Sequence, residues 1–342
     1  MKYSNNTLFY PDNKALEKSI EYTISLVSDD VANSASADNK VAVADNFIYT
    51  RGNFEQHRYS ANVFEIARET LEAKLTEKLR EESPKDWAVT NNSLGNILAA
   101  LGQSLRDAKL FKLSIESFNN ALEVFSQDET PLEWAASQYN LGTAMQALGR
   151  QEADTKLLSK SIDAYTDALL VWSRKETPEE WATAMYQLGV TYHTYGSLLK
   201  GNRNLQKSVV AFKNALAELD ADNYALELAA THNNRAAALH NLGESEENPE
   251  RLEEAIRSYD TALTVCMEQQ LPFHLAVLCR VNKATAHSVL AELTNNAVLA
   301  EETADEIELI IECFSHALQP LSLKHCKEQL EKMRSFALNG NG

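Results

Sequence analysis

The sequence predicts an all-α protein, an α-solenoid of stacked antiparallel helix pairs, from three recurring residue types. Trp87, Trp134 and Trp181 recur at a constant step, because 134 − 87 = 47 and 181 − 134 = 47. Proline and glycine recur at the same step, at Pro84, Pro131 and Pro178 and at Gly102, Gly149, Gly196 and Gly243. Self-similarity at a fixed interval in several columns of equivalent residues is typical of stacked repeats, each packing on its neighbours.

Each repeat is predicted to contain two helices, and the first of them, helix A, begins at the recurring proline. Residues 130–133 (Thr-Pro-Leu-Glu) place a hydroxyl at the N-cap, proline at N1 and a carboxylate at N3, as do residues 83–86 and 177–180. We expect the hydroxyl to accept a hydrogen bond from an early backbone N–H. An apolar stripe follows at Trp134, Leu141, Met145 and Leu148. Gly149 fits the position after the helix, where a positive φ costs glycine little.

Helix B is predicted to begin near Asp107, Asp154 or Asn248, whose side chains can cap a helix. In the second repeat it carries an apolar stripe at Ile162, Tyr165, Ala168, Leu169 and Trp172. Small and large side chains alternate between the two helices. This alternation suits two antiparallel helices in close contact.

The repeats divide the chain into three segments: residues 1–83, an N-terminal helix at about 13–31 and a degenerate repeat; residues 84–271, four long repeats; and residues 272–342, an atypical final repeat and a C-terminal capping helix. Terminal repeats of solenoids are usually atypical. In the final repeat, residues 303–306 are expected to supply the capping box of helix B. The last helix is expected to begin at Pro320.

The segments Asn140-Leu141-Gly142, Ala168-Leu169 and Thr177-Pro178 resemble the tetratricopeptide repeat (TPR), with its LG, small and terminal proline positions. The usual repeat of about 34 residues would here be lengthened to the long-repeat form common in bacterial proteins. The resemblance covers residues 83 to about 271. It implies a TPR-like right-handed superhelix in which helix A lines a concave groove. It is specific for fold and weak for function.

Composition limits the choice of partner and compartment. The net charge of −17 argues against nucleic acid and against anionic membranes and favours a neutral or basic protein partner. No run approaches the roughly 18 apolar residues of a membrane span, and the N-terminus lacks a signal-like apolar region. We therefore expect a cytoplasmic protein with reduced, buried thiols at Cys266, Cys279, Cys313 and Cys326.

A row of polar residues precedes the leucine of LG in successive repeats: Ser93, Asn140, Gln187 and Asn234, with Val281 interrupting it in the fifth. An amide both donates and accepts, so it can satisfy the backbone of an extended peptide. This row is similar to the asparagine ladders of kinesin light chains and Pins-type adaptors, which implies peptide binding. The alternative, that these amides only bond to neighbouring helices, remains open.

The predicted partner-binding groove combines this row with the neighbouring columns of helix A. Its members are Asn92, Asn96, Tyr139, Asn140, Gln146, Tyr186, Gln187, His193, Asn233, Asn234, His240 and Arg280. The bound segment would be an extended peptide or a helix of a partner protein.

The histidine column of His193, His240 and His287 suggests a different function, a ligand or pH sensor or an enzyme. One repeat separates consecutive histidines, which is too far for a shared metal ion with bonds of about 2 Å. Packing of the imidazoles between helices is the simpler interpretation.

No phosphate loop, nucleophile elbow, metalloprotease motif or dinucleotide fingerprint is present. The acidic run 244–247 reads as a solvated loop. We therefore predict a non-enzymatic scaffold or adaptor without cofactor or metal. A second interpretation is a homo-oligomeric scaffold that docks through its ends or its convex face.

Overall fold

The computed structural model describes residues 61–316, 318 and 320–340, and every regular element in this region is an α-helix. The described chain forms two compact parts that divide between Ala184 and Met185. We call residues 61–184 the first part and residues 185–340 the second part, and describe each by itself. The predicted helix at 13–31 and the first helix of the degenerate repeat lie outside the described residues.

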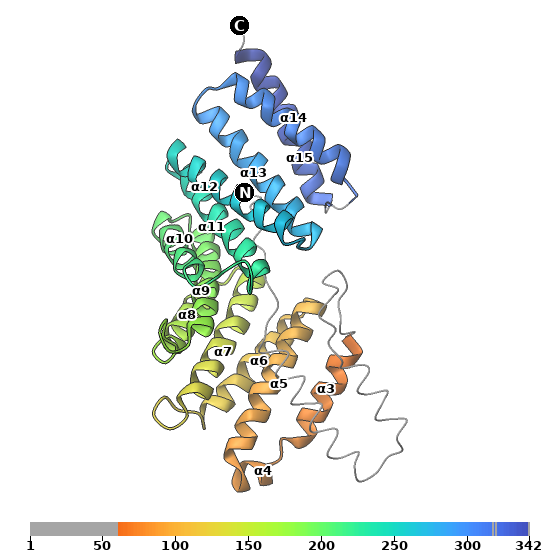
Figure 1. Ribbon diagram of the computed structural model, residues 1–342. Helices are drawn as coiled ribbons and strands as arrows, with labels where there is room; N and C mark the ends of the chain where they lie inside the picture. The colour runs from red at the N-terminus through yellow and green to blue at the C-terminus, as the bar shows by residue number, and fades with distance from the viewer. Residues whose placement is uncertain (1–60, 317, 319, 341–342) are drawn as a thin grey trace. The chain divides into compact units, whose positions relative to one another are not determined.

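The first part contains α3 (Ala61–Lys74), α4 (Glu77–Glu82), α5 (Pro84–Leu105), α6 (Ala108–Leu122), α7 (Pro131–Glu152), α8 (Thr155–Ala168) and the start of α9 (Pro178–Leu199). The second part contains the rest of α9, then α10 (Asn202–Leu216), α11 (Ala225–Ser245), α12 (Pro249–Glu268), α13 (Phe273–Leu293), α14 (Ala297–Phe314) and α15 (Pro320–Gly340) (Figure 1). The odd-numbered helices α5 to α13 are A helices, and each packs on the B helix that follows it.

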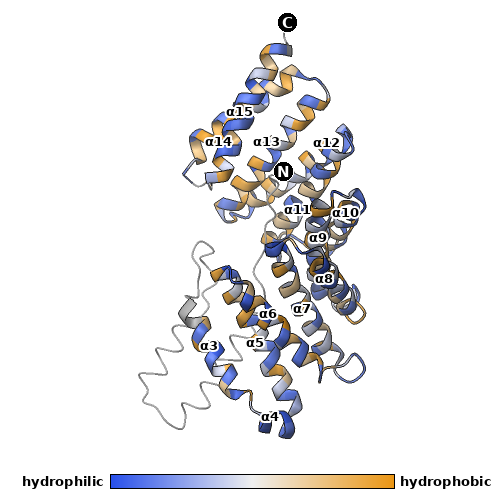
Figure 2. Cartoon of the chain, turned by 180° about the vertical axis from the view of Figure 1, so that it is seen from behind, coloured by the Kyte–Doolittle hydropathy of each residue, from blue (hydrophilic) through white to orange (hydrophobic). Residues whose placement is uncertain are grey.

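These helix pairs confirm the predicted fold class, an all-α solenoid. The A helices α5, α7, α9 and α11 begin at residues 84, 131, 178 and 225, a constant step of 47 (131 − 84 = 47). Each helix carries both hydrophobic and hydrophilic residues (Figure 2). In the second repeat, Leu141, Leu148, Tyr165 and Trp172 are buried as the two stripes predict.

Glycine lets helices A and B approach closely. A Cβ at Gly142 would lie 2.9 Å from the ring of Tyr165. Ser161 Oγ on helix B donates a 2.8 Å hydrogen bond to the carbonyl of Gly142. The same arrangement recurs with Gly95, Phe118 and Ser114 in the first part and with Gly189, Phe212 and Ser208 in the second.

The second glycine column does not end helix A, so the prediction for Gly149 is wrong. No glycine in the described chain has a positive φ, and α7 continues to Glu152. The left-handed residue is Ala153, at φ 54°, and the N–H of Asp154 bonds to the carbonyl of Gly149 at 2.8 Å. Gly149 instead provides space, because a Cβ there would lie 3.1 Å from Leu158. Equivalent left-handed residues are Arg106, Lys200 and Glu247.

The helix starts follow the sequence prediction for B helices and depart from it for A helices. Asp107, Asp154 and Asn248 cap α6, α8 and α12 through their side chains, as predicted. Thr130 makes no such bond at the start of α7. Its hydroxyl accepts from the N–H of Ser126, four residues earlier, at 3.0 Å. The predicted hydroxyl cap is therefore wrong because the preceding turn uses this oxygen.

The fifth repeat is displaced by one residue. The A helices α11 and α13 begin at Ala225 and Phe273, and 273 − 225 = 48. Helix α14 starts earlier than predicted, because Asn296 caps it by accepting from the N–H of Leu299 at 3.0 Å. Thr303, expected at the cap, lies inside α14 with its hydroxyl bonded to the carbonyl of Leu299. The predicted capping box at this position is wrong.

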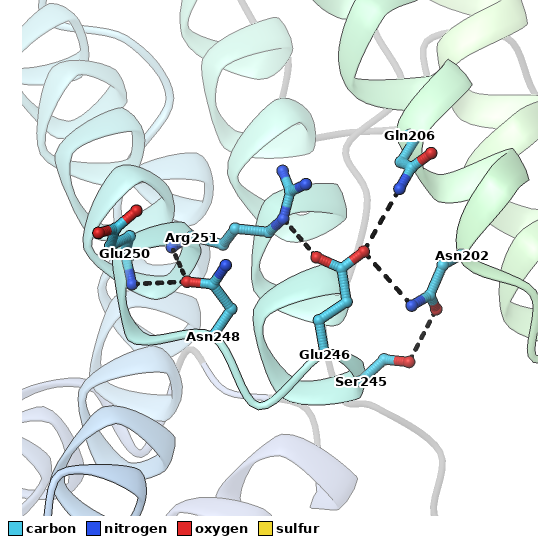
Figure 3. Close-up of polar contacts among 7 residues, drawn as sticks. All are labelled: Asn202, Gln206, Ser245, Glu246, Asn248, Glu250 and Arg251. Atoms are coloured by element: carbon cyan, nitrogen blue, oxygen red, sulfur yellow. Dashed lines mark hydrogen bonds and ion pairs between the residues drawn. The ribbon is translucent and has the colours of Figure 1, made fainter.

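The C-terminal end of helix A binds helix B of the preceding repeat at equivalent positions in both parts. Glu152 accepts from Lys112 Nζ at 3.0 Å. Glu246 accepts from Gln206 Nε2 at 3.4 Å and forms an ion pair with Arg251 (Figure 3). The acidic run expected to be a solvated loop therefore contributes a side chain that joins two helix pairs.

Helix α15 packs against α14 and α13. Cys326, Met333 and Ala337 are buried and pack against apolar side chains of α13 and α14, whereas Lys324 and Glu331 are exposed. Three of the four cysteines are buried as predicted, but Cys313 is exposed.

Candidate functional site

Two asparagines join the A helices of successive repeats in the first part. Asn140 on α7 donates through Nδ2 to Asn92 Oδ1 on α5 at 3.3 Å, and Ser137 Oγ donates to the same oxygen at 3.2 Å. Asn140 Oδ1 is buried and accepts no hydrogen bond from the described residues. Asn92 is half-buried, and its Nδ2 donates none to them. The pair therefore retains an unused acceptor at Asn140 Oδ1 and the unused N–H donors of Asn92 Nδ2.

A continuous chain of hydrogen bonds joins three A helices in the second part. Asn282 on α13 donates to Asn233 on α11 at 3.1 Å, and Asn233 donates to its neighbour Asn234 at 3.1 Å. Asn234 donates to the hydroxyl of Tyr186 on α9 at 2.8 Å. All four side chains are buried. Here the amides bond to neighbouring helices, which is the alternative that the sequence left open.

The tyrosines of the predicted groove pack against B helices. The ring centroid of Tyr139 lies 5.5 Å from that of Tyr165 and 5.4 Å from that of Trp172. The ring of Tyr186 lies 5.8 Å from that of Phe212. These rings form the interior of their helix pairs, and the Tyr186 hydroxyl also belongs to the polar chain.

The remaining amides of the predicted groove differ in exposure. Asn96 and Gln146 are each 5% exposed, whereas Gln187 is half-buried. Of the twelve predicted groove residues, only Asn92, Gln187 and Arg280 keep appreciable exposure.

Two histidines of the predicted column are buried in the second part. His193 and His240 are 6% and 1% exposed, and burial lowers the pKa of each to about 4. Both are therefore neutral at pH 7. Asn241 Nδ2 lies 2.9 Å from His193 Nε2 and donates to it. Nδ1 of His240 has no hydrogen-bond partner in the described chain.

The one-residue displacement removes His287 from this column. Ser288, which is 1% exposed, occupies the position equivalent to His240. His287 Nδ1 instead lies 3.7 Å from the carboxylate of Glu306 on α14. A fixed step of 47 residues therefore aligns His287 with His240, although Ser288 is the equivalent residue.

The displacement also changes the amide row in the fifth repeat. Val281 was expected to interrupt the row, but Asn282 occupies the position and bonds to Asn233. Arg280 lines a pocket with residues of α12 and α14, apart from the polar chain of Asn233 and Asn234. Sequence reasoning missed Asn282 because it allowed no insertion. It also missed Ser137, because a single serine in helix A does not by itself indicate a contact with the neighbouring repeat.

The polar groups that join the A helices are amides, hydroxyls and neutral imidazoles. Such groups donate and accept hydrogen bonds and suit recognition of a peptide backbone. Among the described residues, no three or more His, Cys, Asp or Glu side chains are grouped so as to hold a metal ion. No helix in this region is long and apolar enough to cross a membrane.

Comparisons with known proteins find similarity at the level of structure alone. No protein-family model matches the chain, and no curated protein matches it. A solved structure described as the crystal structure of Rap protein complexed with competence and sporulation factor is 13% identical, with a TM-score of 0.26. The match covers 95% of this chain and 99% of that one. This similarity is too distant to indicate a function.

Proposed function

We propose that this protein is a non-enzymatic scaffold or adaptor that binds an extended segment of a partner protein along α5 and α7. One observation carries the proposal: Asn92 keeps an unused amide donor, and Asn140 keeps an unused acceptor. Each peptide unit of an extended chain offers one acceptor and one donor to match them. A buried unpaired acceptor costs about 1–3 kcal/mol. Asn140 Oδ1 is fully buried in the described chain, so binding requires local opening of the contact between α5 and α7. A peptide N–H that then bonds to Asn140 would remove this cost.

An extended segment suits these groups better than a helix does. The N–H and C=O groups inside a helix are already paired with one another. An extended chain leaves them available, and amide side chains can bind it with modest demands on its sequence. In the second part, Asn282, Asn233, Asn234 and Tyr186 bond to one another, so we assign the peptide site to the first part.

The wider prediction follows from the resemblance and the charge. The step of 47 residues between A helices fits the long-repeat bacterial form of the TPR fold. The net charge of −17 favours a neutral or basic partner segment. We propose a cytoplasmic location because the sequence has no apolar run long enough for a membrane span and no signal-like apolar region.

A peptide selection tests this function. A phage library of linear peptides is selected on the full chain, and the affinities of enriched peptides are measured by fluorescence anisotropy. We expect Asn92→Ala and Asn140→Ala each to weaken binding about 10-fold, the effect of one buried hydrogen bond. Asn119→Ala, an exposed site on α6, is the matched control and should bind like wild type. Equal affinity in all variants would reject the site on α5 and α7.

A further inference from the structure

A pocket of about 570 Å³ lies between α12, α13 and α14 in the second part. Its apolar side chains are Leu263, Met267 and Leu309, of which Met267 is 70% exposed. Two cations of α13, Arg280 and Lys283, line the same space. The proposed peptide site uses none of these residues.

Lys283, which lines the pocket, and His287, one turn further along α13, are polar residues at positions where earlier repeats have core leucines. With the step of 48 residues, Lys283 corresponds to Arg235, and in the earlier repeats to Leu141, which is 6% exposed and packs on Phe118 of the preceding B helix. His287 likewise corresponds to Leu239, which is 1% exposed. Half-buried charges cost free energy that an apolar core avoids. Such departures from local packing rules are expected at functional sites.

Three of the charged groups that line the pocket are already in ion pairs. Lys283 Nζ lies 2.7 Å from Asp260, and Asp305 lies 2.7 Å from Arg334. Arg280 makes no hydrogen bond or ion pair within the described residues, and its guanidinium lies 5.8 Å from the ring centroid of Phe314. The guanidinium of Arg280 therefore lines the pocket with its N–H donors unused by the described residues, although it lies near the ring of Phe314 and the carboxylate of Glu306.

Glu306 provides the complementary negative charge. Within the described chain, its only basic side chain at contact distance is His287, at 3.7 Å, which is farther than the 2.7 Å between Lys283 and Asp260. Burial raises the pKa of Glu306, but the contact with His287 and the nearby cations Lys283 and Arg280 outweigh burial and lower it overall. The carboxylate is therefore ionised at pH 7. One weakly paired anion and one unpaired cation line the same pocket.

We propose that this pocket binds a free α-amino acid with an apolar side chain. Arg280 binds the carboxylate through its planar fork of N–H donors, and Glu306 binds the ammonium group. The apolar side chain contacts Leu263, Met267 and Leu309. A simple anion would meet the carboxylates of the pocket, and a simple cation would leave Arg280 unpaired. A zwitterion satisfies both groups.

Isothermal titration of the full chain with L-leucine, L-methionine and L-phenylalanine tests the proposal. Leucinamide lacks the carboxylate, and N-acetyl-L-leucine lacks the ammonium group. We expect saturable binding of at least one amino acid and about 10-fold weaker binding of both leucine analogues, since each loses one charge-assisted hydrogen-bonded contact. Absence of saturable heat with all three amino acids would overturn the proposal. Equal binding of N-acetyl-L-leucine or leucinamide would also overturn it.

Paired variants separate recognition from folding. Arg280→Gln should weaken the binding of leucine about 10-fold. It should leave the affinity for leucinamide unchanged, because leucinamide has no carboxylate for Arg280 to bind. Glu306→Gln should weaken the binding of leucine. It should leave the affinity for N-acetyl-L-leucine unchanged, because this analogue has no ammonium group for Glu306 to bind. Arg257→Gln, at an exposed arginine of α12 outside the pocket, is the control and should bind like wild type. Unaltered leucine affinity in Arg280→Gln, with native circular dichroism, would contradict the proposed contacts.

Discussion

Gly142 lies so close beneath the ring of Tyr165 that a Cβ would be 2.9 Å from Cε1 of the ring. Tyr165 is fully buried and cannot move away without disturbing the pair α7 and α8. We therefore expect Gly142→Ala to destabilise the protein by about 1–3 kcal/mol, the usual cost of overpacking a core. Urea unfolding measures this loss.

Gly201→Ala is the control for this substitution. No heavy atom lies within 4 Å of a Cβ at Gly201, so no overpacking is expected there. Because Gly201 is the N-cap of α10, where alanine is less favourable than glycine, we expect a smaller loss of below about 1 kcal/mol. Equal stability of Gly142→Ala and wild type would mean that α7 and α8 are farther apart than described.

The left-handed residue at the end of α7 predicts a stabilising substitution. Ala153 has φ 54°, a conformation that costs roughly 1–2 kcal/mol for residues with a Cβ and little for glycine. Ala153→Gly should therefore raise the free energy of unfolding by about 1 kcal/mol. Ala147→Gly, inside the same helix, should lower it by about 1 kcal/mol. Thermal and urea unfolding of both variants give the sign of each change in the free energy of unfolding. A lower stability of Ala153→Gly would contradict the left-handed conformation at the end of α7.

Buried neutral histidines predict a loss of stability in acid. The pKa of His240 is about 4 in the folded protein and about 6.5 in the unfolded chain, so only the unfolded chain binds the proton between these values. Stability is complete above pH 6.5 and falls as the pH decreases toward 4. At pH 5, His240 alone should lower the free energy of unfolding by about 2 kcal/mol, and His193 should lower it by a similar amount.

His240→Leu isolates this contribution, since leucine fills the site without titrating. We expect the variant to exceed wild-type stability by about 2 kcal/mol more at pH 5 than at pH 7.5. Urea midpoints at the two pH values provide the comparison. Parallel pH profiles for the two proteins would show that His240 is accessible to protons in the folded state.

The recurring columns predicted the helix pairs well, because stacking requires equivalent residues at equivalent positions. Pro131 marks the start of α7, and Asp154 caps α8, as expected. Gly149 was misread because a glycine near a helix end suggests a positive φ. Its actual role is close packing, which the seven-residue spacing from Gly142 on one face of the helix could have indicated.

The site was harder to predict than the fold. A fixed step of 47 residues cannot detect one inserted residue. It therefore aligned Val281 with Asn234 and His287 with His240, whereas the structure aligns Asn282 and Ser288 with them. Helical periodicity places Tyr139 on a polar face, but its ring packs on Tyr165 and Trp172. Side-chain hydrogen bonds between repeats depend on distances that sequence spacing does not contain.

The central claim is that Asn140 binds a backbone N–H of an extended partner segment. A selected peptide is therefore synthesised with each backbone amide N-methylated in turn, and the affinity of each form is measured for wild type and for Asn140→Ala. We expect one methylation to weaken binding to wild type about 10-fold and to leave binding to Asn140→Ala unchanged. If every methylation affects the two proteins equally, Asn140 binds no backbone N–H and the account is contradicted.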